Sequence, residues 1–148
     1  MVYSFKPYEP QPILTNHLNM GASNPQGVPF EVTSAYFTRG GKPWIGVMGE
    51  FHFSRYDCTE WRRELAKMKA GGITVVASYL FWIHHEEREG VFNFSGNNDL
   101  RRFVEECRSL GLDVFLRIGP WAHGECRNGG FPDWLLAKPL TTRDNDEA

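Results

Sequence analysis

Short apolar runs alternate with amphipathic stretches through most of the chain. Residues 73–81, ITVVASYLF, form a nearly continuous apolar run rich in β-branched residues, and residues 113–120, DVFLRIGP, form a second one. Strands that are apolar on both sides are typical of a parallel sheet covered by helices. The pattern therefore predicts two buried parallel strands.

Three segments around these strands have the apolar spacing of helices. In residues 57–72 the apolar residues recur on one face, Asp57 and Glu60 match a capping box, and two glycines end the helix. Residues 99–112 carry a second apolar face, and residues 132–138 begin a third helix with a proline near its first turn. The alternation of strands and helices implies βαβ units.

The N-terminal part has a different pattern. Residues 1–29 are polar and contain several prolines, which predicts an irregular arm. Two extended runs lie on either side of Arg-Gly-Gly-Lys at residues 39–42, which predicts a β-hairpin. The second run, residues 44–53, is long enough to continue into the core. We therefore expect an arm over residues 1–29 and one domain over residues 30–148.

Two architectures remain open for that domain: a doubly wound open sheet and a (β/α)8 barrel. No Gly-rich phosphate loop follows any strand, which weakens a dinucleotide-binding version. Polar and aromatic residues gather just after each strand, where both architectures place their sites. A full barrel takes roughly 250 residues, so three βα units would be an N-terminal fragment of one.

Charge and composition exclude several classes of function. The net charge is −2 with both signs mixed along the chain, which gives no support to nucleic-acid binding. No apolar run approaches a membrane span. Cysteines 58, 107 and 126 are widely spaced and odd in number, so we expect neither a disulfide framework nor a zinc motif. The N-terminus lacks a secretory signal, which predicts a cytoplasmic protein, or a periplasmic or secreted one if the true start lies upstream.

The first polar group is Glu50, His52 and Arg55, in GEFHFSR. It is either the bottom of a sugar pocket or a buried network of ion pairs and hydrogen bonds, and we favour the network. Arg117 lies inside an apolar strand and needs a buried anionic partner, for which Glu50 and Glu86 are the candidates.

The second group includes Tyr79, His84, His85 and Glu86. Neighbouring residues on a strand point to opposite faces, so the two histidines are poorly placed to bind one ion, and we expect no metal site. Tyr79 combines a flat apolar body with a hydroxyl, which suits either sugar binding or an ordinary core position.

The third group lies in the loop GPWAHGECRNGGFPDW. Trp121 offers a stacking surface, and His123 and Glu125 offer a donor and an acceptor. Glu125 either accepts hydrogen bonds from sugar hydroxyls in a cleft or pairs with Arg127 in solvent, and the residues alone do not separate these two interpretations.

The stretch KMKAGGITVVASYLFWIHHEEREGVFNFSGNNDLRRFVEECRSLGLDVFLRIGPWAHGECRNGGFPDWL resembles the first half of the catalytic barrel of glycoside hydrolase family 35, the β-galactosidases. The preceding GKPWIGVMGEFHFSR resembles that family's first strand. The resemblance covers roughly residues 30–148. Its most specific piece is the Arg-Ile-Gly-Pro-aromatic strand end, followed by Glu125 and then Gly-Gly-Phe-Pro-Asp-Trp-Leu.

The resemblance implies an α/β fold that is an incomplete (β/α)8 TIM barrel of about three βα units, preceded by the arm and hairpin. It implies a retaining β-galactosidase that uses no cofactor and acts on a β-galactoside carbohydrate. The family's acid/base glutamate follows its fourth strand and its nucleophile follows its seventh. Neither region exists in this chain, so we expect no catalytic residue in it, and we expect it to be inactive without the remainder of its barrel.

The resemblance also implies a substrate-binding set. Tyr79 matches a tyrosine that contacts the sugar, Glu125 matches a glutamate that holds galactose hydroxyls, and His123 and Gly124 match positions that line the site. Three positions depart from the family pattern and leave the exact β-linked sugar open: Glu50, Ile83 and Cys126. Two alternatives remain, a complete non-catalytic carbohydrate-binding α/β module and a small open-sheet α/β binding domain.

Overall fold

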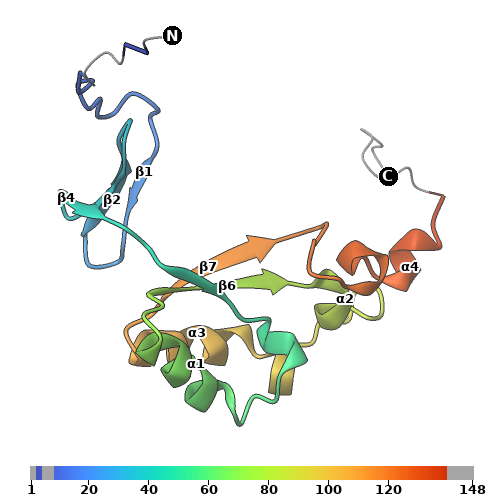
Figure 1. Cartoon of the computed structure of the whole chain (residues 1–148). Helices are drawn as coiled ribbons and strands as arrows, with labels where there is room; N and C mark the ends of the chain where they lie inside the picture. Colours follow the sequence, from blue (N-terminus) through green and yellow to red (C-terminus); the bar gives the residue numbers. More distant parts are fainter. Residues whose placement is uncertain (1–2, 5–8, 140–148) are drawn as a thin grey trace. The chain divides into compact units, whose positions relative to one another are not determined.

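The computed structural model describes residues 3–4 and 9–139 (Figure 1). The chain forms two compact units, Met1–Ile45 and Gly46–Ala148, and each is described by itself. The division predicted between residues 29 and 30 stays a prediction.

The first unit is a small antiparallel sheet with the strand order β1-β2-β3-β4. Its strands are β1 Gly21–Ser23, β2 Pro29–Val32, β3 Phe37–Arg39 and β4 Lys42–Trp44. Arg39 pairs with Lys42 across Gly40 and Gly41, which both have positive φ, as a two-residue hairpin turn requires. The predicted hairpin is confirmed.

One detail of the N-terminal prediction is wrong. The segment expected to be irregular contains β1, because Gly21–Ser23 pairs with the start of β2. The run over residues 44–53 continues into the second unit, as expected, but it is divided between two strands. β4 ends at Trp44 in the antiparallel sheet, whereas β5, Met48–Glu50, pairs in parallel with a strand of the second unit.

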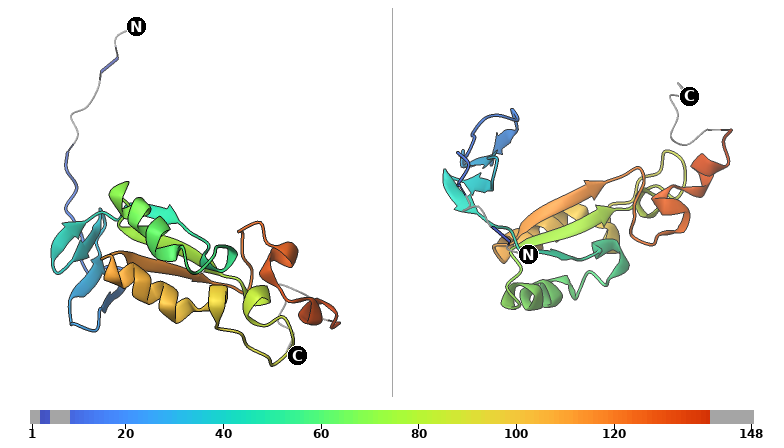
Figure 2. Two further views of the ribbon diagram at one scale, coloured as in Figure 1. Left: turned by 90° about the horizontal axis from the view of Figure 1, so that it is seen from below. Right: turned by 45° about the horizontal axis from the view of Figure 1, so that its top comes forward.

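The second unit contains a parallel sheet with the order β5-β6-β7 (Figure 2). The two predicted apolar runs form β6, Val75–Leu80, and β7, Asp113–Ile118. The register places Glu50 opposite Ala77 and Tyr79 opposite Arg117. Since successive side chains alternate between faces, Glu50, Tyr79 and Arg117 project from the same face of the sheet. The predicted α/β class is confirmed.

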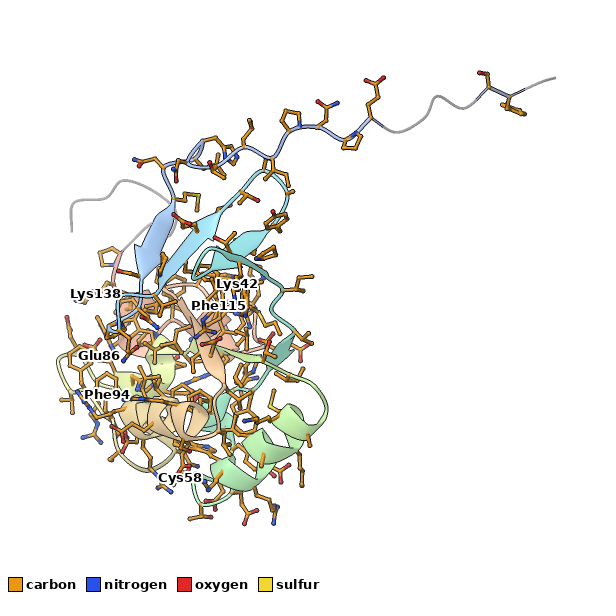
Figure 3. All side chains as sticks on the ribbon, turned by 90° about the vertical axis from the view of Figure 1, so that its left-hand side faces the viewer. Lys42, Cys58, Glu86, Phe94, Phe115 and Lys138 are labelled. Carbon is orange, nitrogen blue, oxygen red and sulfur yellow. The ribbon has the colours of Figure 1, made fainter. Side chains whose placement is uncertain are left out.

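Two helices cover the other face of this sheet (Figures 1 and 2). They are α1, Trp61–Ala70, and α3, Leu100–Ser109. The main core is built from side chains of the helices, the sheet and the adjoining loops: Phe53, Trp61, Leu65, Val76, Phe103, Cys107 and Leu112. On the face away from the helices, Met48 and Phe115 remain about half-exposed. Phe115 is labelled in Figure 3.

Five short helical elements follow the strands and shape their ends. They are η1 Phe53–Arg55, α2 Trp82–His85, η2 Gly96–Asn98, η3 Arg127–Gly130 and α4 Asp133–Leu136. The helix predicted over residues 132–138 is thus confirmed at its start but shorter than expected.

The predicted capping box of α1 does not form. The carboxylate of Asp57 accepts hydrogen bonds from the backbone and hydroxyl of Thr59, both two residues on, and the helix begins only after Glu60. A short polar side chain can bond to nearby backbone in a turn, and here that local bond replaces the cap. By contrast, Asp99 does cap α3, where its carboxylate accepts from the backbone N–H of Arg102. No helix of the described residues is long and apolar enough to cross a membrane.

Candidate functional site

Glu50, His52, Tyr79 and Arg117 form a connected group at the carboxyl ends of the parallel strands. His52 Nε2 donates to Glu50 Oε1 at 2.6 Å, and Arg117 forms an ion pair with the same oxygen. The guanidinium of Arg117 also lies over the Tyr79 ring, with its carbon 3.8 Å from the ring centroid. Of the two partners proposed for Arg117, Glu50 is therefore the one it uses.

This network determines the charge of Glu50. The hydrogen bond from His52 lowers the pKa of the Glu50 carboxyl, and the charge of Arg117 lowers it further. Arg55 Nη1 donates to His52 Nδ1 at 3.3 Å, which fixes the ring with its proton on Nε2. Glu50, His52 and Arg55 are joined in a hydrogen-bond network to which Arg117 belongs, but the Glu50 side chain is 44% exposed, so the expectation of a buried network is wrong in that respect.

Phe81 lies at the centre of the aromatic side chains at this end of the sheet. Its ring is fully buried, and it lies 5.6 Å from the Tyr79 ring, 5.3 Å from the His52 ring and 5.1 Å from the His84 ring. The guanidinium carbon of Arg55 lies 4.5 Å from its centroid. Phe81 therefore sets the positions of polar groups that come from three different segments.

Gly124 brings the loop after β7 against this aromatic group. A Cβ at this position would lie 2.6 Å from Phe81 Cζ and 3.0 Å from Tyr79 Cδ2. Only glycine allows the backbone to approach the rings this closely. The contact joins two of the predicted binding residues, Gly124 and Tyr79, and the other two, His123 and Glu125, flank Gly124 in the chain.

Glu125 itself is exposed and has a positive φ of 51°. The interpretation that it pairs with Arg127 is wrong, because Arg127 Nη2 binds Asp133 Oδ2 at 2.8 Å instead. Within the part of the chain that the structure describes, the Glu125 carboxylate makes no hydrogen bond or ion pair. It is therefore available to accept hydrogen bonds from a ligand.

Trp121 and His123 extend the same loop. The Trp121 ring packs closely on Gly129, because a Cβ on Gly129 would lie 2.3 Å from Trp121 Cζ3. The Trp121 ring also meets the His123 ring edge-on, with their centroids 6.0 Å apart. Gly129 has a positive φ of 63°, which further restricts this position to glycine. The loop is thus shaped to present one partly exposed aromatic face and one exposed imidazole.

The second polar group is arranged differently from the expectation. His84 and His85 lie on the short helix α2 and not on a strand, because the chain turns directly after β6. His84 Nδ1 is 2.8 Å from Ser54 Oγ, whereas His85 Nδ1 donates to the backbone oxygen of Asn93 at 3.0 Å. The histidines thus point to different partners. In the described residues, no group of three or more His, Cys, Asp or Glu side chains could hold a metal ion.

Two members of the site have only weak signals in the sequence. Arg117 was identified as needing a partner, but choosing Glu50 required the strand register. Phe81 ends an apolar run and belongs to the second group of candidate residues, but nothing in the sequence separates a core phenylalanine from one that supports a site. Taken together, the group offers aromatic faces, an unpaired carboxylate and imidazole donors, which suits a ligand with several hydroxyls.

Known proteins match much of the chain but only part of their own length. A beta-galactosidase of Xanthomonas manihotis is 41% identical over 122 residues, which cover 82% of this chain and 20% of that protein. A beta-galactosidase of Bos taurus is 38% identical over 111 residues, which cover 74% of this chain and 17% of that protein. The chain thus spans about a fifth or less of the length of these relatives.

A solved structure is similar at a lower level. The exo-beta-1,4-mannosidase Op5Man5 from Opitutaceae bacterium strain TAV5 matches with 18% identity and a TM-score of 0.49, over 77% of this chain and 19% of that one. The family model for glycosyl hydrolases family 35 matches residues 36–148, which confirms the resemblance found in the sequence, and the chain belongs to this family.

Proposed function

We propose that this chain carries one side of the galactose-binding site of a retaining β-galactosidase that removes terminal β-linked galactose from glycans or oligosaccharides. Tyr79, His123, Gly124 and Glu125 are the residues that contact the sugar. The observation that carries the proposal is the packing of Gly124 on the rings of Tyr79 and Phe81. It joins two segments at the carboxyl ends of adjacent parallel strands, where α/β proteins bind their ligands.

The proposed roles follow from the chemistry of each side chain. The exposed carboxylate of Glu125 accepts hydrogen bonds from two neighbouring sugar hydroxyls. Tyr79 offers its hydroxyl, and its ring is held by the guanidinium of Arg117 on one side. His123 supplies a donor beside the Trp121 ring. Gly124 contributes no side chain, which lets the loop pack on the rings of Tyr79 and Phe81 and sets the positions of its neighbours His123 and Glu125.

Hydrolysis needs groups that these residues do not supply. A retaining enzyme uses two carboxyl groups only about 5–5.5 Å apart, one of which must be protonated to act as the acid. Glu50 is poorly suited to that role, because its oxygen is already bound by His52 and Arg117 and its pKa is lowered. We therefore propose that the acid/base and the nucleophile come from polypeptide outside these residues, and that this chain alone does not hydrolyse substrate.

The same reasoning favours a barrel over a self-contained binding module. Strands β5, β6 and β7 are the first three strands of a (β/α)8 barrel in this proposal. Their face away from the helices would then be the interior of the closed barrel. The half-exposed side chains of Met48 and Phe115 support this assignment, because a complete module would bury them.

Galactose binding by the 148-residue chain tests the proposal. Galactose should change the chemical shifts of Tyr79 and Glu125 in NMR spectra, and Glu125→Gln should weaken the affinity by about tenfold, as the loss of a charged hydrogen bond implies. Glu105→Gln, an exposed carboxylate on α3, is the matched control and should leave the affinity unchanged.

Two results would contradict the proposal. One is an affinity for galactose that Glu125→Gln and Tyr79→Phe leave intact. The other is clear turnover of a chromogenic β-galactoside by the purified chain that disappears in Glu125→Gln, because Glu125 would then act in catalysis and not in binding.

A further inference from the structure

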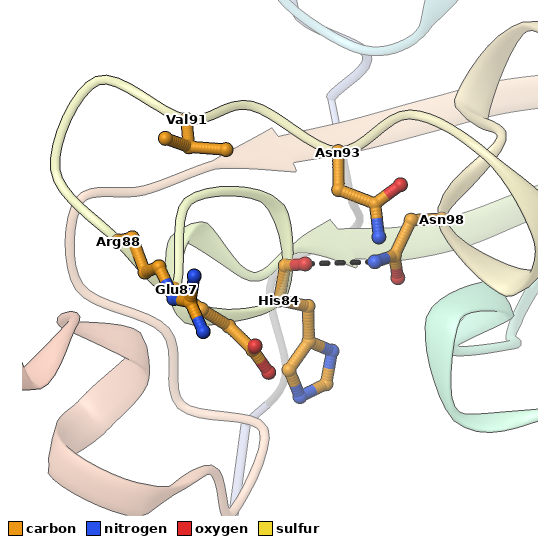
Figure 4. Close-up of a pocket in the computed structure, with 6 residues that line it drawn as sticks. All are labelled: His84, Glu87, Arg88, Val91, Asn93 and Asn98. Carbon is orange, nitrogen blue, oxygen red and sulfur yellow. Dashed lines mark hydrogen bonds between the residues drawn. The ribbon is translucent and has the colours of Figure 1, made fainter.

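A pocket lies in the segment that connects β6 with α3, and it is separate from the residues of the proposed galactose site (Figure 4). It has a volume of about 240 Å³ and is lined by side chains of one loop and its two ends: His84, Glu87, Arg88, Val91, Asn93 and Asn98. None of these is among the residues assigned to galactose. The volume is below that of pockets for drug-sized ligands, so the pocket suits one small ring.

The pocket offers donors and acceptors in balance. Asn93 Oδ1 already accepts from the backbone and hydroxyl of Ser95, which leaves its amide nitrogen as a free donor. Asn98 Nδ2 already donates to the backbone oxygen of His84, which leaves its side-chain oxygen as an acceptor. Glu87 adds a carboxylate acceptor and Arg88 a guanidinium donor, both exposed.

His84 adds a ring nitrogen that can act as a hydrogen-bond donor or as an acceptor. Its Nδ1 is engaged by the hydroxyl of Ser54, so Nε2 is the ring nitrogen left for a ligand. Burial lowers the pKa of His84, and the nearby charge of Arg55 lowers it further, so the ring is neutral at pH 7. Because a hydroxyl can donate or accept, both tautomers satisfy Ser54, and Nε2 can then act as acceptor or donor.

The pocket is held in place before any ligand binds. Asn93 and His85 are joined twice, since the Asn93 N–H donates to the His85 oxygen at 2.7 Å and His85 Nδ1 donates to the Asn93 oxygen at 3.0 Å. The Asn98 side chain closes the other end of the loop on His84 at 2.7 Å (Figure 4). The buried ring of His85 is packed against Phe94 at 4.8 Å. A ligand would therefore meet a preformed site.

The composition of the lining selects one class of ligand. Glu87 disfavours phosphate and other anions, and the single carboxylate beside Arg88 does not suit a metal ion. The residues that line the pocket include no large aromatic ring, which disfavours a nucleobase or another flat ring that needs stacking. The presence of both donors and acceptors, with one apolar wall from Val91, suits a neutral ring that carries several hydroxyls.

The pocket is also close to the proposed galactose site. The rings of Tyr79 and His84 both pack against Phe81, at 5.6 and 5.1 Å, so their centroids lie within about 11 Å of each other. This separation is within the span of two linked sugar rings. Tyr79 is the next-to-last residue of β6, and His84 lies on α2 directly after that strand.

We propose that this pocket binds the sugar unit to which the terminal galactose is linked, through His84, Glu87, Arg88, Asn93 and Asn98. The inference rests on the proposed function, and it assigns to the substrate at least two sugar units. The enzyme would then distinguish galactosides by the sugar that follows galactose, which the residues at Tyr79 and Glu125 do not contact.

The test compares galactose with lactose, a disaccharide with a terminal β-linked galactose, on the full 148-residue chain. Lactose should bind about tenfold more tightly than galactose, as roughly one or two added hydrogen bonds imply. The His84 ring should shift in NMR spectra with lactose and not with galactose. Glu87→Ala combined with Arg88→Ala should remove the gain for lactose and leave galactose binding unchanged.

Controls separate this inference from the function on which it rests. Glu105→Ala with Arg108→Ala removes the same pair of charges from an exposed face of α3 and should change neither affinity. If galactose binds but lactose binds no more tightly and His84 does not shift, the second sugar site is wrong and the galactose site stands. If neither sugar binds the wild-type chain, the proposed function is wrong, and this inference fails with it.

Discussion

The substitution Gly124→Ala tests how closely the loop after β7 must approach the aromatic group. An added Cβ would lie 2.6 and 2.8 Å from Phe81 Cζ and Cε1, and 3.0 Å from Tyr79 Cδ2. Separations below 3 Å between carbon atoms are well inside van der Waals contact, so either the loop or the rings must move. The Phe81 ring is fully buried and has His52, Tyr79 and His84 around it, which leaves it little room.

The expected cost can be derived from this geometry. Overpacking a well-packed site costs about 1–3 kcal/mol, and the lack of free space around Phe81 favours the upper half of that range. For a chain of this size, such a loss lowers the midpoint of thermal unfolding by roughly 4–12 °C. Because the displaced ring next to Phe81 is Tyr79, galactose affinity should fall by about tenfold as well.

Circular dichroism melting and a galactose titration measure the two effects. Gly71→Ala is the matched control, because Gly71 has a negative φ and an added Cβ there would meet its nearest atom, Met68 O, at 3.4 Å. It should leave both the midpoint and the affinity unchanged. If Gly124→Ala melts within about 1 °C of the wild-type chain and binds galactose equally well, the close approach of the loop to the rings is refuted.

Three further outcomes follow from the charges and the burial. Glu50→Gln removes the partly exposed ion pair with Arg117, so the free energy of unfolding in urea at neutral pH should fall by about 1 kcal/mol. An unchanged urea midpoint would contradict the network. Burial lowers the pKa of His84 and His85, so in acid the unfolded chain binds more protons than the folded chain. The free energy of unfolding should therefore be constant above about pH 7 and fall below about pH 6.5. The fall should be less steep in His85→Gln. Burial raises the pKa of the Cys107 thiol to about 12, so a thiol reagent should label only the two half-buried cysteines of the native chain, and rapid labelling of all three would refute this.

The parts of the fold that depend on local sequence could be predicted. Continuous apolar runs predicted β6 and β7. Glycines at positive φ form the expected hairpin turn and follow the ends of both long helices. The location of the site at the carboxyl ends of the strands also follows from the pattern, because polar residues come directly after each apolar run.

The remaining features depend on contacts between distant segments. Glu50 and Glu86 were equal candidates for Arg117 until the register of three strands placed Glu50 on the same face. Glu86 instead accepts from Trp82 Nε1 at 2.5 Å and from the backbone of Gly90 at 2.8 Å. The pocket between β6 and α3 was not predicted, since its shape comes from hydrogen bonds across a loop that has no periodic pattern.

Glu50 and Glu125 both lie near the candidate site, but they differ in whether groups of the protein already bind their carboxylates. Glu50 has its charge compensated within the protein by His52 and Arg117, so a ligand there would have to compete with existing bonds. Glu125 has a positive φ, a backbone conformation that costs a non-glycine residue roughly 1–2 kcal/mol. No group in the described residues compensates the charge of its carboxylate, because Arg127 binds Asp133. A ligand hydroxyl can replace water at an exposed carboxylate that has no partner in the described residues, without breaking a contact within the protein. A sugar with neighbouring hydroxyls would do so at Glu125 and would gain little at Glu50, which is why the binding role is assigned to Glu125.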